Sequence, residues 1–176
     1  MKNNLNNFNE LQYLMYRIVK DHFTVSNENL NGKPLLLLVR GIAGSGKSYV
    51  IDALGNLLQS KHQVLAYTGK AAFNVNSITL NSLLKLHISS RQQHDLKGMA
   101  LPQLQDNLTG INYLIMDEYS FVSQNLFGWS DSHYRQANGK ADQPFGGFSI
   151  ILFGDIAQLS AVPKSEKTNY RVSNVL

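Results

Sequence analysis

The chain has 176 residues, of which 43% are hydrophobic, enough to form the core of one globular domain. Cysteine is absent, which excludes disulfides and thiolate metal sites, and the five histidines show no tight ligand spacing. The formal net charge of +4 is compatible with a polyanionic partner such as nucleic acid, although no run of Lys and Arg stands out.

Membrane-spanning and secretory segments are not expected. No apolar stretch approaches the roughly 20 residues that cross a bilayer, and the start of the chain, MKNNLNNFNE, lacks the apolar core of a secretory signal. We therefore expect a soluble intracellular protein, in the nucleus if the source is eukaryotic and in the cytoplasm if it is prokaryotic or viral.

The first predicted element is an amphipathic helix over about residues 9–23, where apolar residues recur at helical spacing. It lies in an N-terminal segment, residues 1–24, that precedes the main domain at residues 25–176. A turn signal at residues 31–34 leads into LLLLV at residues 35–39, a wholly apolar run typical of a buried parallel strand. A Gly-rich loop follows, and a second helix is predicted to open at Lys47.

Three further apolar runs, at residues 64–67, 113–116 and 148–153, are separated by helix-compatible segments at residues 79–86 and 124–136. Alternating strands and helices predict an α/β fold with a parallel β-sheet flanked by helices. Residues 88–110 are polar and weakly patterned, and we interpret them as an excursion between core elements.

The Gly-rich loop reads GIAGSGKS and fits G-x-x-x-x-G-K-[ST] directly after a strand and before a helix, as this phosphate-binding motif requires. Its glycines let backbone N–H groups curl round phosphates, while Lys47 reaches the outer phosphates and Ser48 supplies a hydroxyl ligand for Mg²⁺. The alternative is a mere Gly-rich turn. The predicted nucleotide-binding residues of this segment are Gly41, Ala43, Gly44, Ser45, Gly46, Lys47, Ser48 and Tyr49.

Two acidic residues follow the apolar run at residues 113–116. Because a parallel strand ends at the sheet edge beside the phosphate loop, Asp117 is predicted to hold Mg²⁺, mainly through water. Glu118 is predicted to orient and deprotonate the attacking water. The alternative for this pair is a solvated acidic turn.

The strand at residues 148–153 also ends in polar groups, so Asp155 and Gln158 are expected at the same edge. An amide such as that of Gln158 can touch the γ-phosphate and couple its departure to movement of the loop. An ordinary turn is the alternative here.

Taken in order, the segments GIAGSGKS, AYTGKAAFNV, SITLNSLL, LIMDEYS, PFGG and GDIAQLSAV resemble the motif series of superfamily-one DNA helicases of the Pif/RecD type. The resemblance spans about residues 8–163. It implies the first of two RecA-like motor domains, a P-loop ATPase that uses ATP and Mg²⁺ to move along single-stranded DNA, usually 5′-to-3′, and to unwind duplexes.

The same resemblance assigns DNA contacts. Thr68, Gly69 and Lys70 match the motif that grips the DNA backbone, although Lys70 also fits an exposed lysine at a helix start. Thr79 and Asn81 fall in a second DNA-contacting segment.

Two more residues match the family pattern less specifically. Gln12 resembles the glutamine that reads adenine, with an ordinary helix-surface glutamine as the alternative. Arg135 precedes the PFGG segment and either supports the structure or faces DNA.

The sequence departs from the family pattern in three places. Asn81 stands where a histidine that can stack on a base is usual, and Ser160 and Ala161 replace two prolines, which loosens that loop. The chain also stops at Leu176, before the second RecA-like domain that would bring arginine fingers to the γ-phosphate. We therefore expect these 176 residues alone to bind nucleotide and hydrolyse it very slowly.

Two other function classes remain open. A small-molecule or nucleoside kinase shares the phosphate loop and would use a carboxylate to activate a substrate hydroxyl, but it does not need the TGKAA or GDIAQL segments. A non-catalytic nucleotide-binding module would not need an intact set of Lys47, Ser48, Asp117, Glu118 and Gln158.

Overall fold

The computed structural model describes residues 7–28, 32–66, 78–84 and 95–155. Its helices and strands largely alternate along the chain, with the exceptions of β2 followed by β3 and α4 followed by α5. In chain order they are α1 (Glu10–Glu28), β1 (Leu36–Arg40), α2 (Lys47–Leu58), β2 (His62–Ala66), β3 (Ile78–Thr79), α4 (Leu80–Leu84), α5 (Ala100–Leu108), β4 (Tyr113–Asp117), α6 (Gln124–Asn138) and β5 (Ser149–Gly154), with short 3₁₀ turns η2 (Gln59–Lys61), η3 (Tyr119–Phe121) and η4 (Pro144–Gly147).

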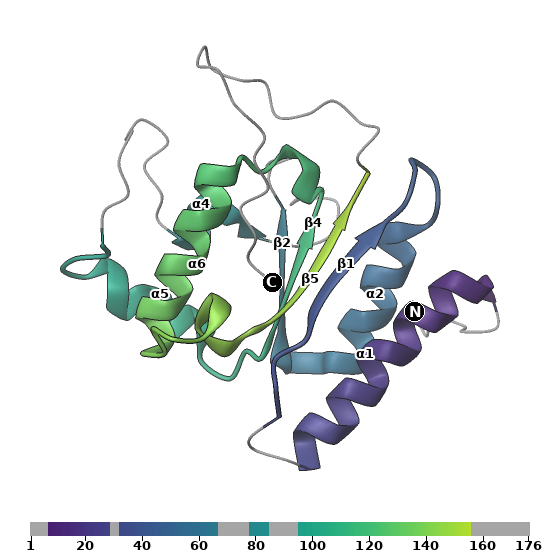
Figure 1. Ribbon diagram of the computed structural model, residues 1–176, viewed down its shortest axis with the longest axis horizontal. Coiled ribbons are helices and arrows are strands. Elements are labelled where there is room, and N and C mark those ends of the chain that lie inside the picture. Colours follow the sequence, from purple (N-terminus) through teal and green to yellow (C-terminus); the bar gives the residue numbers. More distant parts are fainter. Residues whose placement is uncertain (1–6, 29–31, 67–77, 85–94, 156–176) are drawn as a thin grey trace.

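The strands form one parallel sheet in the order β1-β5-β4-β2-β3. Helices α1 and α2 cover one face, and α4, α5 and α6 lie on the other (Figure 1). Every residue of β4 is buried, because this central strand has a helical layer on both sides. The predicted parallel α/β fold is therefore confirmed, and all strands end at the same edge of the sheet.

Helix α1 packs on α2 through Met15 and Val19, which are buried with the apolar residues of α2. It continues to Glu28, whereas the apolar spacing predicted an end at about residue 23. The division into residues 1–24 and 25–176 stays a prediction. Nothing between Thr24 and Ser26 breaks a helix, and the Thr24 hydroxyl donates to the Lys20 carbonyl one turn back.

No helix in the described ranges is both long and apolar enough to cross a membrane.

Helix α5 lies in the stretch interpreted as an excursion, and that interpretation is wrong for its described part, residues 95–110. Leu104 is 1% exposed and Leu108 is 5% exposed, and both belong to the core against α4 and α6. Pro102 stands in the first turn, where its missing N–H leaves no hydrogen bond unmade. Residues 88–94 lie outside the described ranges.

The helix predicted over residues 79–86 begins one residue later, at Leu80, and is described to Leu84. Thr79 is the last residue of β3, and its hydroxyl oxygen accepts a hydrogen bond from the Ser82 N–H at 3.2 Å. This is an N-cap contact, which explains why the helix starts after the threonine.

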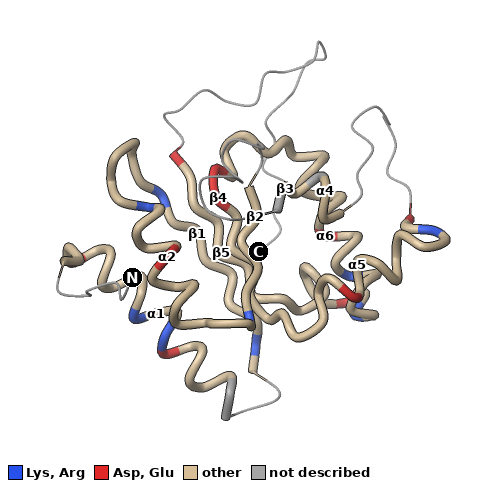
Figure 2. The backbone as a smooth tube through the Cα atoms, turned by 180° about the vertical axis from the view of Figure 1, so that it is seen from behind, with Lys and Arg blue, Asp and Glu red and all other residues tan. Residues whose placement is uncertain are grey.

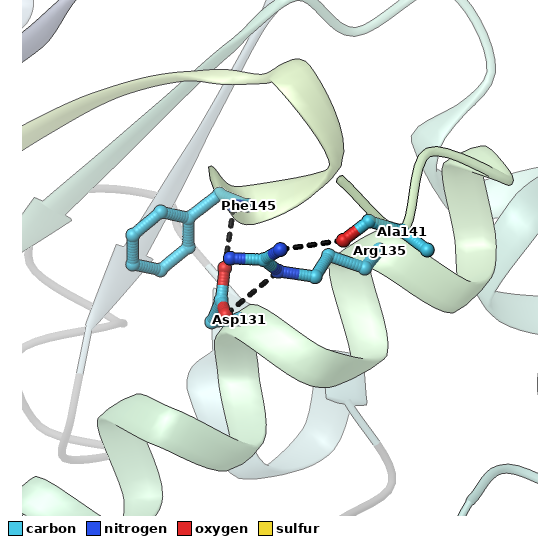
Figure 3. A network of polar contacts seen from close by, with 4 residues as sticks. All are labelled: Asp131, Arg135, Ala141 and Phe145. Carbon is cyan, nitrogen blue, oxygen red and sulfur yellow. Dashed lines mark hydrogen bonds and ion pairs between the residues drawn. The ribbon is translucent and has the colours of Figure 1, made fainter. Parts of the chain in front are cut away.

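A polar network joins α6 to the PFGG turn that precedes β5 (Figure 3). The Asp131 carboxylate accepts from Arg135 Nε at 2.8 Å and from the Phe145 N–H, while Arg135 also donates to the Ala141 carbonyl. Phe145 has a positive φ of 50°, so its backbone is held in a conformation that such a residue rarely adopts. Of the two alternatives for Arg135, these contacts support the structural one.

We expect Asp131→Ala to lower the free energy of unfolding by about 1–3 kcal/mol, since it removes a charged acceptor from two donors. In a domain of this size, that loss corresponds to a fall of roughly 2–10 °C in the midpoint of thermal unfolding, measured by circular dichroism. Asp142→Ala is the matched control, because Asp142 is an exposed acid close to the same turn. Equal midpoints for the two variants would show that the network does not stabilise the fold.

Candidate nucleotide-binding site

The loop between β1 and α2 has the backbone of a phosphate cradle. Gly44 and Gly46 have φ angles of 76° and 81°, a region that glycine enters without steric cost. Gly46 is the N-cap of α2, and no side chain caps this helix end. The first N–H groups of α2, together with the positive end of its dipole, are therefore directed at any anion that enters the loop.

Lys47 folds back over this loop. Its Nζ donates to the carbonyl oxygens of Gly41 and Ile42, at 2.7 and 3.0 Å. The Gly41 N–H in turn donates to the Gly154 carbonyl at 3.1 Å, which ties the start of the loop to the end of β5. The ammonium group is thus held at the mouth of the cradle.

Asp117 ends β4 at the same edge of the sheet and is only 8% exposed. Its carboxylate accepts a hydrogen bond from the Glu118 N–H at 2.9 Å. Burial raises the pKa of Asp117, while that hydrogen bond and the charge of Lys47 act in the opposite direction. Because β1, β5 and β4 are parallel neighbours, Asp117 at the end of β4 lies at the same sheet edge as the phosphate loop that follows β1.

Glu118 follows in a left-handed backbone conformation, with a φ of 55°. A non-glycine residue in this region is strained, and such strain often marks a functional position. Burial and the neighbouring negative charge of Asp117 raise the pKa of Glu118, and the charge of Lys47 opposes them. A carboxylate with a raised pKa is a stronger base than an ordinary one, as general base catalysis requires.

The end of β5 completes this edge. Asp155 is 8% exposed and directly follows Gly154, so it lies at the same edge of the sheet as Asp117. Figure 2 shows the acidic ends of β4 and β5 on the same side of the molecule as the loop between β1 and α2. The Tyr119 ring packs against Gly154, where an added Cβ would lie 2.5 Å from two ring carbons. Sequence reasoning missed this contact, for which the sequence carries no signal beyond the glycine itself.

Gln12 reaches the phosphate loop from α1. Its Nε2 donates to the Ser45 carbonyl at 2.9 Å, although 33 positions separate the two residues in the chain. The structure therefore joins Gln12 to the site, and its contact with adenine stays a prediction.

The remaining predicted residues are distributed as follows. Ala43 and Ser48 are exposed in the loop and at the start of α2, and the ring of Tyr49 packs on Phe8 with 5.3 Å between centroids. Thr79 caps α4, which starts at the end of β3, the edge strand next to β2. Asn81 belongs to α4. Thr68, Gly69, Lys70 and Gln158 lie outside the described residues.

The raised pKa of Asp117 has a consequence for stability. An acid with a higher pKa in the folded state binds more protons there, so the free energy of unfolding falls as pH rises through the interval between the unfolded and folded pKa values. We expect Asp117→Asn, which keeps an oxygen for the Glu118 N–H, to melt at a higher temperature than the parent at pH 7 without nucleotide. The difference should vanish near pH 4, where the unfolded acid also titrates, at about 3.9.

Thermal unfolding at the two pH values measures this effect. Asp106→Asn is the control, because Asp106 is an exposed acid on α5 and its replacement should not change the melting temperature at either pH. A parent protein that melts above Asp117→Asn at pH 7 would show that the buried carboxylate stabilises the fold.

Comparison with known proteins identifies the family of the chain. The family model for PIF1-like helicase matches residues 16–176. The ATP-dependent DNA helicase PIF1 of Danio rerio is 31% identical over 157 residues, which cover 88% of this chain and 24% of that protein. The chain thus spans about a quarter of the length of this curated relative.

Solved structures show the same similarity. Unliganded Pif1 from Bacteroides sp superposes with a TM-score of 0.71 at 27% identity, over 91% of this chain and 34% of that one. Pif1 helicase from Bacteroides in complex with ADP-AlF3 and ssDNA gives a TM-score of 0.63 at 29% identity, over 82% and 34% of the two chains. With the buried Asp117 and the half-buried Glu118 at the sheet edge where its phosphate loop lies, and with nearly its whole length matched, this chain belongs to the PIF1-like helicase family.

Proposed function

We propose that this chain is an ATP-hydrolysing motor domain of a DNA helicase that moves 5′-to-3′ along single-stranded DNA and unwinds duplexes. The observation that carries the proposal is that Lys47, Asp117 and Glu118 lie at one sheet edge, in and beside a loop whose Gly44 and Gly46 have left-handed φ angles. Membership of the PIF1-like helicase family supports the choice of DNA as the track.

The site fits Mg²⁺ as well as a nucleotide. A divalent cation offsets the cost of burying Asp117, and the exposed Ser48 hydroxyl at the start of α2 offers a second hard oxygen ligand. When bound, the ion would neutralise charge on the phosphate oxygens. Among the described residues no group of three or more His, Cys, Asp or Glu could hold a metal ion.

The protein groups divide the hydrolysis between them. Lys47 exchanges its bonds to the loop carbonyls for bonds to the outer phosphates, and the N–H groups of the loop and of α2 hold the rest of the triphosphate. Glu118 accepts a proton from water as its oxygen attacks the γ-phosphorus, and the bond between that phosphorus and the oxygen of ADP breaks. The products are ADP and inorganic phosphate.

We expect slow turnover from these 176 residues alone. The chain covers about a quarter of its Danio rerio relative, and the family resemblance places arginine fingers in a second RecA-like domain. A finger of this kind contributes about 10³ to 10⁵ in rate. Binding of ATP is therefore the primary activity to test, with hydrolysis followed in single turnovers.

The decisive experiment is a titration of the chain with ATP, with and without Mg²⁺ and a single-stranded oligonucleotide. The proposal predicts Mg²⁺-dependent ATP binding and an ATP hydrolysis rate that single-stranded DNA increases. A nucleoside kinase would instead transfer the γ-phosphate to a nucleoside and ignore DNA, and a non-catalytic module would bind without any turnover. Either of these outcomes would overturn the proposal.

A further inference from the structure

Tyr119 belongs to the turn η3, which directly follows Glu118. The turn is closed by two backbone bonds, from the Phe121 N–H to the Glu118 carbonyl at 3.1 Å and from the Val122 N–H to the Tyr119 carbonyl at 2.9 Å. These bonds set the shape of the turn. Because they lie within it, they do not hold it against the neighbouring strand β5.

The contact with β5 is made by the Tyr119 ring, which packs on Gly154 at the end of that strand. A Cβ added to Gly154 would lie 2.5 Å from the ring carbons Cδ1 and Cε1, and 3.4 Å from the backbone nitrogen of Ser120. Gly154 lies in a strand and does not have a positive φ, so its backbone conformation does not favour glycine over other residues. The ring accounts for the absence of a side chain at position 154.

Gly154 also holds the start of the phosphate loop. Its carbonyl accepts a hydrogen bond from the Gly41 N–H at 3.1 Å, and the Gly41 carbonyl accepts one from Lys47 Nζ at 2.7 Å. The turn that follows Glu118 and the loop that contains Lys47 are thus both placed against one residue of β5.

Glu118 needs such support because its backbone is strained. Its φ of 55° lies in the left-handed region, where a residue other than glycine persists only if the surrounding structure holds it. On one side the Glu118 N–H donates to the Asp117 carboxylate. On the other side the Tyr119 ring is seated on Gly154, which keeps the turn from relaxing.

We propose that Tyr119 is a positioning residue for hydrolysis, whose ring on Gly154 holds the Glu118 carboxylate where it can take a proton from the attacking water. The proposal rests on the proposed function, because it requires that Glu118 is the general base. Tyr119 acts through Glu118 and does not touch the reacting atoms. The alternative is that the ring only fills space beside the core under α4, α5 and α6.

Single-turnover hydrolysis and ATP affinity, measured on the same variants with Mg²⁺, separate these two roles. Misplacing a catalytic group by about 1 Å can lower a rate by about 10²-fold. We expect Tyr119→Ala to lower the rate of hydrolysis by about 10- to 100-fold and to leave ATP affinity within about two-fold of the parent. Tyr119→Phe keeps the ring that contacts Gly154 and should match the parent in both measurements.

Phe127→Ala is the control, because Phe127 is a partly buried residue of α6 whose ring packs on Phe145. Both alanine variants should melt below the parent, but Phe127→Ala should hydrolyse ATP at the parent rate. A parent-like rate in Tyr119→Ala would overturn the proposal. So would a loss of ATP affinity as large as the loss of rate, or an equal loss of rate in Phe127→Ala.

Gly154→Ala tests the same contact with the ring in place. The added methyl group meets the ring, so it should displace the turn and lower the rate by about 10-fold. In the double variant Tyr119→Ala/Gly154→Ala the methyl group has room, and the rate should be no lower than in Tyr119→Ala alone. The same loss from Gly154→Ala with and without the ring would overturn the proposal.

A parent-like rate in Gly154→Ala would overturn the proposal even if Tyr119→Ala did not fold. If the parent hydrolysed no ATP in single turnovers, the proposed function would fall and the role of Tyr119 with it. An active parent with unaffected variants would remove the role of Tyr119 alone.

Discussion

Lys47→Ala is expected to weaken ATP binding by about 100- to 1,000-fold. Hydrogen bonds to charged groups contribute about 1.5–3 kcal/mol each, and the ammonium group can donate to more than one oxygen of the outer phosphates. Loss of two such bonds near the lower end of this range is about 3–4 kcal/mol, which corresponds to the expected change in the dissociation constant. Lys47 already lies over the loop without nucleotide, so few side-chain rotamers need to be lost when ATP binds.

Fluorescent nucleotide displacement measures this change over the required range. Lys20→Ala is the control, because Lys20 is an exposed lysine on the far part of α1 and its loss removes the same formal charge. Circular dichroism should show the parent fold in both variants, since the bonds lost from Lys47 go to carbonyls that water can reach. If Lys47→Ala bound ATP within a factor of two of the parent, the loop between β1 and α2 would not be the phosphate-binding site.

The sheet and the catalytic edge could be predicted from sequence because their signals are local. An apolar run followed by GIAGSGKS specifies strand, loop and helix within residues 35–58, and the run before Asp117 and Glu118 specifies a second strand. Parallel strands place their carboxyl ends at one edge, so separate runs in the sequence were enough to bring Lys47 and Asp117 together. The charge of Lys47 lowers the pKa of both acids, against the larger effect of burial, which agrees with that proximity.

Features that depend on tertiary contacts were not predicted. Helix α5 shows apolar residues at positions 101, 104 and 108, a helical spacing, but the polar residues around them and Pro102 hid it. The left-handed backbone of Glu118 could not be predicted from the sequence, because among the residue types mainly glycine and asparagine adopt this conformation. The bond from Gln12 to Ser45 joins segments 33 positions apart, and periodicity along a chain carries no information about such a pair.

Glu118→Gln is expected to leave ATP binding within about two-fold of the parent and to lower the single-turnover rate of hydrolysis by about 10²- to 10⁴-fold, the usual contribution of a general base. Glutamine has the same shape and tolerates the left-handed backbone no worse than glutamate, so the fold should be kept. The amide removes the negative charge that Asp117 and burial make costly, and the variant without nucleotide should melt above the parent at pH 7.

The pH profile of hydrolysis separates a base at Glu118 from a residue that only shapes the site. Glu118 must be ionised to accept a proton, so the parent rate should rise with pH through the raised pKa of this carboxyl and then level off. Glu118→Gln should lose that rising limb, while Asp155→Asn, at the neighbouring strand end, should keep it. A parent-like rate and pH profile in Glu118→Gln would show that proton transfer does not depend on the Glu118 carboxylate. The general base would then have to be another group at this edge of the sheet.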